Sequence, residues 1–508
     1  MTRTSRSISN IIWAIIYKMI AIIMPFLVRT VIIYKLGLAY AGLNGLFSSV
    51  LTVLSLSELG FSNAIVYSMY QPIHDNDIPQ LCALLNLYKK VYRIIGLVVA
   101  GVGLSLIPAL NYLIKGAYPQ DINLVLLYLV FLINTVMSYF MFSYKSALLT
   151  AYQRYDIVSK IGLLWNFVFY LLQITTLFFF KNYYIYTLTL PVLTIIINIR
   201  YELASRKEYP EIHCEGSLAK AKLAEIKKSV SGALLYKVSS ISRTSFDSII
   251  ISVFLGLTVL AQYQNYFLII SSLSGVLGVI NTSITASVGN SIVSKSQNEN
   301  YHDFKSILTL YMCISIVFTT CLVGLYQPFM KIWVGIENTL STGMAVLFCL
   351  YFFVQTMGDI VYVYRMAAGL WWGDRIRPIV ESIANVALNI ILVKYFGLYG
   401  VISATILTLF FINFFWGSEI LFKYYFKMSI REYVLLQGKN ILVCAVAVGI
   451  TFALCSLIPD AGFWWLIPRA LISVLIAVIA IICFNSTSPV FQDSLFLMQN
   501  IVRVFRKV

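Results

Sequence analysis

Long apolar stretches separated by short polar connections follow one another along the whole chain. About 14 of them are long enough to cross a bilayer, which takes roughly 20 apolar residues of helix. The predicted spans are residues 9–34, 42–69, 84–113, 122–145, 157–180, 183–204, 229–254, 259–293, 304–329, 341–366, 375–395, 398–424, 440–458 and 463–484. This pattern predicts an all-α, polytopic membrane protein.

Composition supports the same class of protein. Of the 508 residues, 60% are hydrophobic and only 11% are charged, which no soluble globular domain matches. The formal net charge of +16 is gathered in alternate connections. The even-numbered ones are rich in Lys and Arg, whereas the odd-numbered ones offer little beyond Lys35, Lys115, Lys181, Lys331 and Lys394. The positive-inside rule therefore predicts that both termini are cytoplasmic. The charge is a topology signal, with membrane lipid as its partner and not nucleic acid.

The sequence contains signs of an internal repeat. The longest polar connection, residues 206–228, separates six predicted spans from eight. Tyr17-Lys18 recurs as Tyr236-Lys237, at an offset of 219 (236 − 17). The same offset relates Leu36-Gly37-Leu38 to Leu255-Gly256-Leu257, and Asn166 to Asn385. Six spans is an even number, so both halves would enter the membrane from the same side. We expect two six-helix lobes in parallel repeat around a central cavity.

The domain prediction follows from this repeat. Residues 1–205 are expected to form the N-terminal lobe, 206–228 a cytoplasmic linker and 229–427 the C-terminal lobe. Residues 428–508 lie outside the repeat and are expected to add a pair of helices and a basic tail.

Two opposite charges lie within one predicted span. Arg243 and Asp247 are four residues apart and share a helix face. An Arg at the centre of a membrane helix costs about 2.5–3.5 kcal/mol on insertion scales, so the pair must face a wet cavity or a partner. Gln264 and Asn265 follow in the next span. We interpret Arg243, Gln264 and Asn265 as substrate-binding candidates; the alternative is that Arg243 and Asp247 only neutralise each other.

The first span contains two further cations. Lys18 and Arg29 share a face, with Pro25 between them. Eleven residues of helix separate them by about 16 Å, which suits contacts with one substrate at two successive depths. The alternative is that each side chain snorkels to its own membrane interface.

Three carboxylates in the spans are candidates for ion or proton coupling. A carboxylate at the depth of Glu58 in the membrane needs a partner cation or a proton, and the same requirement holds for Asp247 and Glu381. A structural ion pair is the alternative for each, for Glu381 with Arg377 four residues before it. Asn385 lies one turn further along the same face and is a substrate-binding candidate.

Residues typical of enzymes and of metal or cofactor sites are missing. The eight cysteines form no CxxC pair, and the three histidines all fall in polar connections. There is no phosphate-binding glycine loop and no long odd-numbered connection to house a catalytic domain. We therefore expect a transporter and not an enzyme, with no catalytic residue, cofactor or metal.

Several segments resemble a known family. FDSIIISVFLG, AQYQNYFLIISSL and ASVGNSIV resemble the seventh and eighth helices of Wzx-type flippases, which transport lipid-linked O-antigen and capsule repeat units. GDRIRPIVESIANVALNIILVKYFGLYGVISATIL resembles the eleventh and twelfth helices of the same family, and LSELGFSNAIVYSMY resembles a segment near the end of its second helix. The resemblance extends over most of the chain.

The resemblance implies the multidrug/oligosaccharidyl-lipid/polysaccharide transporter fold and a bacterial inner-membrane location. It also implies a flippase that moves undecaprenyl-diphosphate-linked oligosaccharide to the outer leaflet by alternating access, for O-antigen or capsule assembly. Lys18, Arg29 and Arg243 match the family's cavity cations. A polysaccharide polymerase and a chain-length regulator are the implied partners. The alternatives are a cation-coupled drug exporter of the same superfamily, and a membrane-bound polymerase or glycosyltransferase.

Overall fold

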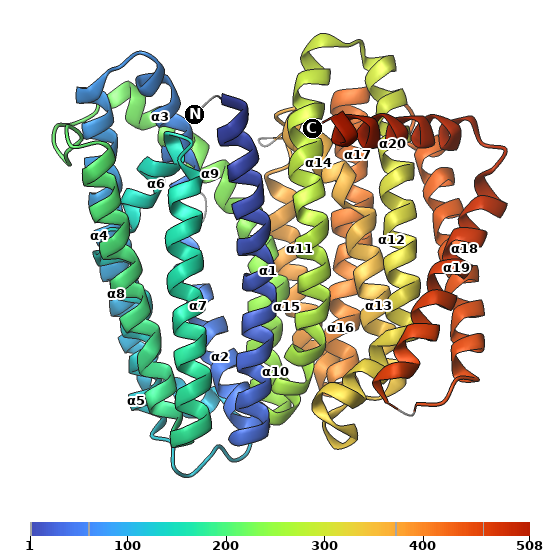
Figure 1. The fold of residues 1–508 in the computed structure, drawn as a ribbon, viewed down its shortest axis with the longest axis horizontal. Helices are drawn as coiled ribbons and strands as arrows, with labels where there is room; N and C mark the ends of the chain where they lie inside the picture. The colour runs from blue at the N-terminus through green and yellow to red at the C-terminus, as the bar shows by residue number, and fades with distance from the viewer. Residues whose placement is uncertain (1–2, 59–60, 371–372, 461, 508) are drawn as a thin grey trace. The chain divides into compact units, whose positions relative to one another are not determined.

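The computed structural model describes residues 3–58, 61–370, 373–460 and 462–507. Within these ranges, the side chains of residues 3–18, 57–58, 63, 228–229, 231–237, 286, 497 and 500–507 lie outside the description. Every regular element in the described ranges is helical, and the long helices within each half of the chain run side by side (Figure 1). The predicted all-α class is confirmed.

Twenty α-helices make up this part of the chain. They are α1 (Arg3–Lys35), α2 (Leu38–Leu54), α3 (Phe61–His74), α4 (Ile78–Ser105), α5 (Leu124–Phe140), α6 (Ser143–Ala151), α7 (Tyr155–Phe180), α8 (Tyr183–Glu208), α9 (Lys220–Ile241), α10 (Asp247–Leu255), α11 (Leu257–Ser294), α12 (Gln297–Val334), α13 (Thr342–Met357), α14 (Asp359–Ala367), α15 (Ile376–Phe396), α16 (Leu398–Thr408), α17 (Gly417–Leu421), α18 (Arg431–Ser456), α19 (Leu466–Asn485) and α20 (Pro489–Lys507). Short 3₁₀ and π-helical turns join several of them.

In the described residues, ten helical stretches are long and apolar enough to cross a membrane, or twelve if each of two bent pairs counts as one span. The bent pairs are α4 with Ile107–Leu113, at 64°, and α5 with α6, at 47°. The two other predicted spans correspond to α1, whose first half has no described side chains, and to residues 42–69. The latter is not one continuous helix, because α2 ends at Leu54 and a 3₁₀ turn, Ser55–Glu58, follows it. Serine side chains at such a turn compete with the helix for backbone hydrogen bonds.

The two halves of the chain repeat the same order of helices. Adding 219 to the first residue of α2 gives 257, where α11 begins, and adding it to that of α4 gives 297, where α12 begins. Gly37 and Gly256, which precede α2 and α11, both have positive φ, at 111° and 90°, and extended ψ. Only glycine adopts this conformation without strain, so the Leu-Gly-Leu motif marks the same turn twice.

By internal packing, the chain forms two compact units, Met1–Ala261 and Gln262–Val508, here called unit 1 and unit 2. Unit 1 includes α9, α10 and the first residues of α11. The predicted lobes, 1–205 and 229–427, stay a prediction. The predicted linker is shorter than expected, because α8 continues to Glu208 and α9 begins at Lys220.

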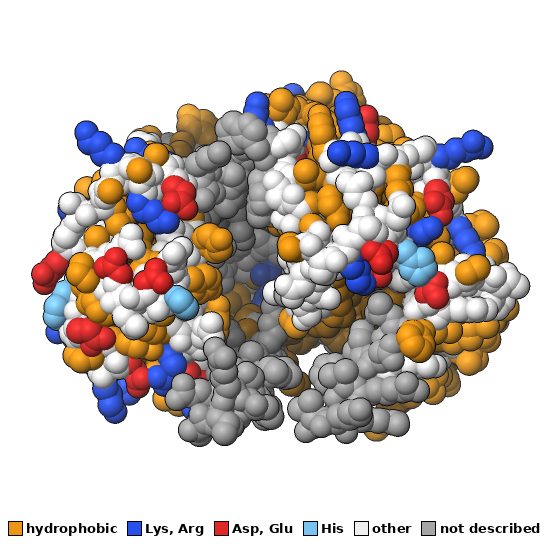
Figure 2. All heavy atoms as spheres, turned by 90° about the horizontal axis from the view of Figure 1, so that it is seen from above, with side chains coloured by type: hydrophobic (Ala, Val, Ile, Leu, Met, Phe, Trp, Pro, Cys, Tyr) orange, Lys and Arg blue, Asp and Glu red, His pale blue; other side chains and the backbone are white. Residues whose placement is uncertain are grey.

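The sides of the helices expose apolar residues that water would not tolerate over so large an area. On α4, Ile94 and Leu97 are more than half exposed, and on α19 Leu471, Leu475 and Ile479 form one outward face. Charged side chains gather instead at the helix ends, as the end view of each unit shows (Figure 2). Apolar sides and charged ends are what a bilayer selects.

Candidate functional site

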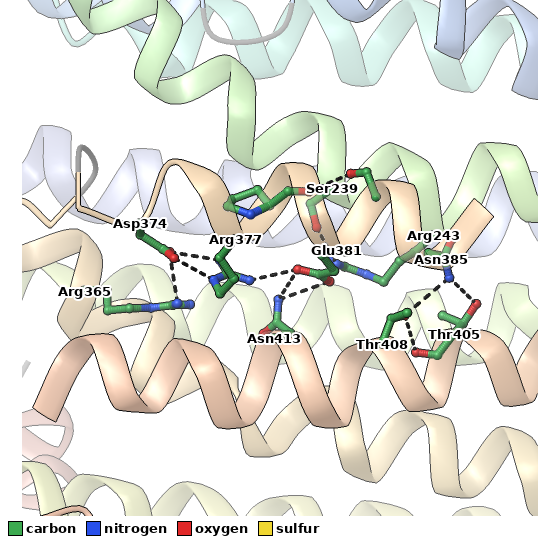
Figure 3. A network of polar contacts seen from close by, with 12 residues as sticks. Ser239, Arg243, Arg365, Asp374, Arg377, Glu381, Asn385, Thr405, Thr408 and Asn413 are labelled. Atoms are coloured by element: carbon green, nitrogen blue, oxygen red, sulfur yellow. Dashed lines mark hydrogen bonds and ion pairs between the residues drawn. The ribbon is translucent and has the colours of Figure 1, made fainter. Parts of the chain in front are cut away.

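The most deeply buried charges of unit 2 form a network where α14 meets α15. Arg365, Asp374, Arg377 and Glu381 are each at most 2% exposed. Nη1 of Arg365 donates to Oδ2 of Asp374 at 3.0 Å, and Nε of Arg377 donates to Oδ1 of the same carboxylate at 2.7 Å. Nη1 of Arg377 also donates to Oε2 of Glu381 at 2.8 Å. The four side chains lie in a row (Figure 3), and their two positive and two negative charges balance.

Local sequence places three members of this network. Asp374 precedes α15, and Arg377 and Glu381 follow at spacings of three and four residues, which puts them on one helix face. Arg365 comes from α14, and Nδ2 of Asn413 reaches Glu381 from the π-helical turn Leu409–Trp416, at 3.2 Å. This geometry fits the structural alternative for Glu381, because a buried carboxylate is stable only when it is paired and hydrogen bonded. Its coupling role stays a prediction.

Asn385 lies one turn beyond Glu381 and is completely buried. Its Nδ2 donates to Oγ1 of Thr405 at 3.1 Å and to Oγ1 of Thr408 at 3.4 Å, both on α16. Nδ2 of Asn389 in turn donates to Oδ1 of Asn385 at 3.3 Å. Amide and hydroxyl contacts of this kind join helices inside membranes. The amide of Asn385 therefore ties α15 to α16, a role that the predicted substrate contact did not include.

A π-helical turn, Ser242–Phe246, separates α9 from α10 and contains Arg243. Nη1 of Arg243 donates to Oγ of Ser239 at 2.9 Å, and Asp247, the first residue of α10, is 1% exposed. The predicted face assumed an uninterrupted α-helix, and a π turn shifts that register by one residue. Such turns occur often at functional sites. No signal in the sequence indicated this turn, since a single extra residue per turn leaves the apolar pattern almost unchanged.

Arg29 is half-buried in unit 1, near Tyr183 and Tyr186 of α8. Its Nη2 donates to the carbonyl oxygen of Ala261 at 3.1 Å. Tyr186 accepts a hydrogen bond from Nδ2 of Asn44 at 3.0 Å. The guanidinium therefore lies among helices and does not extend along the protein surface, so snorkelling alone does not describe it.

Unit 1 contains a buried ion pair that was not predicted from the sequence. Nζ of Lys145 on α6 lies 3.6 Å from Oε2 of Glu202 on α8, and both residues are buried. Nε of Arg206 donates to the other oxygen, Oε1 of Glu202. An acidic residue inside a predicted span was the available signal, since such residues rarely lack a cationic partner.

The shortened linker, residues 209–219, packs against α4 and α6 of unit 1. Its Ile212 is 2% exposed, and Nδ2 of Asn86 on α4 donates to the carbonyl oxygen of Gly216 at 2.8 Å. Tyr144 hydrogen bonds to the Cys214 thiol. Burial raises the pKa of that thiol, while the nearby cations Lys145 and Lys89 act in the opposite direction. The linker is therefore an ordered part of unit 1.

The other predicted site residues are only partly located. The side chains of Lys18 and Glu58 lie outside the described residues. Gln264 is half-buried and Asn265 is completely buried, both on α11. In the described part of the chain, no three His, Cys, Asp or Glu side chains are close enough to hold a metal ion.

Two comparisons by sequence found nothing: no protein-family model and no curated protein matches this chain. Solved structures do match. The lipid II flippase MurJ in an inward closed conformation is similar with a TM-score of 0.65 and 16% identity, over 94% of this chain and 99% of the flippase.

An inward-facing multidrug resistance MATE family transporter of the MOP superfamily is similar over 80% of this chain and 97% of its own, with a TM-score of 0.62 and 14% identity. A MOP superfamily transporter from Pyrococcus furiosus has a TM-score of 0.55 and 13% identity, over 83% and 96% of the two chains. The chain therefore has the fold of these proteins, and all three are transporters by name and not enzymes.

Proposed function

We propose that this protein is a transporter that flips undecaprenyl-diphosphate-linked oligosaccharide from the inner to the outer leaflet of a bacterial cytoplasmic membrane. It works by alternating access and supplies repeat units for O-antigen or capsule assembly. A sugar diphosphate cannot cross hydrocarbon unaided, whereas its polyprenyl chain is soluble there. A polar, cationic path through the protein carries the headgroup across the membrane, while the polyprenyl chain stays in the lipid.

The observation that carries the proposal is how much of the chain each solved structure covers. The helices α18 to α20 extend from Arg431 to Lys507, a substantial part of the chain. The lipid II flippase matches 94% of this chain, so the unmatched remainder is too small to contain those helices. The MATE transporter matches only 80%, and the larger remainder can contain them all. Together with the higher TM-score of the flippase, 0.65 against 0.62, this greater coverage supports a lipid-linked substrate.

The predicted cavity residues take definite roles in this proposal. Lys18, Arg29 and Arg243 contact the diphosphate in turn, and Gln264, Asn265 and Asn385 contact sugar hydroxyls. Arg29 reaches the phosphate from its position beside Ala261, since its guanidinium carries five N–H donors. Glu58, Asp247 and Glu381 are the carboxylates proposed for ion or proton coupling. A polymerase and a chain-length regulator receive the product.

A cation-coupled drug exporter is the second candidate, because the MATE transporter shares the fold. A membrane-bound polymerase or glycosyltransferase, the third class predicted from the sequence, has no support among the similar structures. Transport of glycolipid without a change in its mass separates a flippase from a transferase. Failure to move glycolipid, together with movement of small cations, would favour the exporter.

The test is a flipping assay in proteoliposomes with a fluorescent undecaprenyl diphosphate glycan. A double variant, Arg243→Met with Asp247→Leu, removes one positive and one negative charge together, so the net charge is unchanged. We expect it to insert in normal amount and to flip the glycan at least tenfold more slowly than the wild type, because the diphosphate loses a cation. Lys394→Met, on the exposed side of α15, is the matched control and should transport normally. Full transport by the double variant would show that Arg243 serves only to neutralise Asp247.

A further inference from the structure

Two basic side chains meet one carboxylate where α12 ends and α19 begins. Nζ of Lys331, in the last turn of α12, lies 2.7 Å from Oδ2 of Asp460. Nη2 of Arg469, near the start of α19, donates to Oδ1 of the same carboxylate at 2.7 Å. Asp460 belongs to the connection between α18 and α19, which lies at the end of unit 2 opposite to α20 (Figure 1). These three residues, here called the α12–α19 cluster, therefore come from three segments of unit 2.

The carboxylate of the α12–α19 cluster balances only one of the two positive charges. In the described part of unit 2, Asp460 is the one acidic side chain that pairs with Lys331 or Arg469. Two positive charges and one negative charge leave a positive charge in excess. The side chains of Lys331 and Asp460 are 34% and 38% exposed, so a ligand can reach them from outside the protein. The excess charge favours an anion as that ligand.

The guanidinium of Arg469 is buried, and the protein uses only part of it. The side chain is 8% exposed, and a guanidinium has five N–H groups. Besides its bond to Asp460, Nη2 donates to the carbonyl oxygen of Ile458 at 2.6 Å, and Nη1 donates to that of Gly324 at 3.5 Å. Nε has no hydrogen-bond partner among the described residues. Since buried polar groups are almost always paired, this N–H group indicates a place for an acceptor from outside the chain.

A small cavity lies beside the α12–α19 cluster. All three charged residues line it, together with Pro328, Trp465 and four other residues of α12, α19 and the connection before α19. Its volume is about 20 Å³, which is room for roughly one water molecule. A whole anion therefore does not fit inside. A phosphate group can place one oxygen in the cavity and keep its other oxygens at the exposed side, beside Lys331.

The aromatic residues next to the cluster indicate its depth in the membrane. The 3₁₀ turn Phe463–Trp465 leads into α19, and all three of its side chains are exposed. Exposed tryptophans of membrane proteins lie at the level of the lipid headgroups. The outward apolar face of α19 begins shortly afterwards, with Leu471 and Leu475. The α12–α19 cluster therefore lies beside lipid phosphates, which favours a lipid over a free ion as the anion.

We propose that the α12–α19 cluster binds the phosphate of an anionic phospholipid, such as phosphatidylglycerol. The phosphate accepts hydrogen bonds from Nζ of Lys331 and Nε of Arg469, and charge-assisted bonds of this kind are the strong ones. Asp460 holds the two cations together and sets the affinity, because its charge repels the phosphate. The acyl chains lie along the apolar sides of α12 and α19. A zwitterionic phospholipid brings its own cation and binds more weakly.

Binding is tested with the purified full chain in detergent, titrated with phosphatidylglycerol whose acyl chains carry bromine. Bromine quenches tryptophan fluorescence at short range, so Trp464 and Trp465 report a lipid at this site. We expect saturable quenching, and we expect Trp464→Phe with Trp465→Phe to remove most of it. Saturable quenching that survives this double substitution would place the lipid elsewhere and overturn the proposal.

Two charge variants with opposite expected effects test the site itself. Lys331→Gln removes the excess positive charge and should weaken binding of phosphatidylglycerol about fivefold, while Asp460 keeps its bond to Arg469. Asp460→Asn removes the competing negative charge and should tighten binding by a similar factor. A purely structural ion network predicts no gain for Asp460→Asn, so unchanged or weaker binding by this variant, at an unchanged unfolding temperature, would overturn the proposal. Unchanged binding by Lys331→Gln would do the same.

Matched controls make the same changes of charge away from the cavity. Glu337→Gln alters an exposed carboxylate after α12, and Lys394→Gln alters an exposed lysine of α15. Neither residue lines the cavity, and both variants should bind phosphatidylglycerol as the wild type does.

The source of the phosphate is decided by two further titrations. Brominated phosphatidylcholine should quench the wild type more weakly than phosphatidylglycerol does, and equal quenching would overturn the preference for an anionic lipid. Inorganic phosphate should displace phosphatidylglycerol no better than sodium chloride of equal ionic strength. Displacement by phosphate alone would show a site for the free ion and would overturn the assignment to a lipid. None of these measurements depends on the transported substrate.

Discussion

Each of the two units contains a group of buried charges, and the two units stabilise these charges in different ways. At the α14–α15 junction of unit 2, two arginines and two carboxylates are joined by hydrogen bonds of 2.7–3.0 Å and are shielded from solvent. At the α6–α8 contact of unit 1, a lysine lies 3.6 Å from a carboxylate whose second cation, Arg206, is 70% exposed. Unit 2 therefore has a closed network, in which every charged side chain is buried. Unit 1 has an open network, in which Arg206 is exposed to solvent.

A pair of equivalent residues in the repeat also differs between the units. Asn385 of α15 bonds across to Thr405 and Thr408 of α16, whereas Asn166 of α7, at the same offset in the repeat, donates to Gly162 of its own helix at 2.6 Å. Polar contacts between helices resist relative movement, and contacts within one helix do not. At this equivalent position, the polar contact of unit 2 joins two helices, and that of unit 1 stays within one helix.

The largest effect is expected when a central member of the closed network is removed. Arg377→Met leaves Asp374 and Glu381 buried with fewer hydrogen bonds, which should destabilise the protein by about 3–5 kcal/mol. Lys145→Met leaves Glu202 its bond to Arg206 and should cost less, about 1–3 kcal/mol. Thermal unfolding in detergent, followed by circular dichroism, measures both. Lys394→Met is the control, and equal losses for the two variants would contradict the comparison of the units.

A smaller effect is expected from the two glycines that mark the repeat. In Gly37→Ala, the added Cβ has no other atom within 4 Å. The only cost to stability is therefore the backbone strain of positive φ, about 1–3 kcal/mol. Alanine at Gly256 bears the same strain, and its Cβ would also lie 2.8 Å from the carbonyl oxygen of Lys115. Gly256→Ala should therefore lower the unfolding temperature more than Gly37→Ala. A reversed order would mean that the turn before α2 is the more tightly constrained.

The smallest effect is expected at the half-exposed charges of unit 1. Arg154 pairs with Asp156 and Glu208, and each of these side chains is 25–31% exposed. Solvent screens such pairs, so Arg154→Ala should cost only about 0.2–1 kcal/mol. Unfolding in low and in high salt checks this, since salt should reduce the difference further. A loss as large as that of Arg377→Met would show that exposure is a poor guide to these networks.

Much of the fold could be predicted from the sequence, because apolar length and turn chemistry are local properties. The predicted span 157–180 matches α7 (Tyr155–Phe180), and 375–395 matches α15 (Ile376–Phe396). The break after Leu54 and the bends of 64° and 47° were not predicted, since a bent span has the same mean hydropathy as a straight one. The spacing of Arg377 and Glu381 indicated an ion pair, and the structure contains it.

The sequence by itself determined what each segment can be: an apolar helix, a polar connection, or a glycine turn that recurs once at the offset of the repeat. Only the tertiary structure decided which charges meet. Arg365 and Asp374 lie on opposite sides of the turn between α14 and α15, and Lys145 and Glu202 are separated by the whole of α7, so no spacing rule connects them. The reason is physical, because a charge inside a membrane protein is stabilised by whichever opposite charge the packing brings to it, and packing depends on the whole chain.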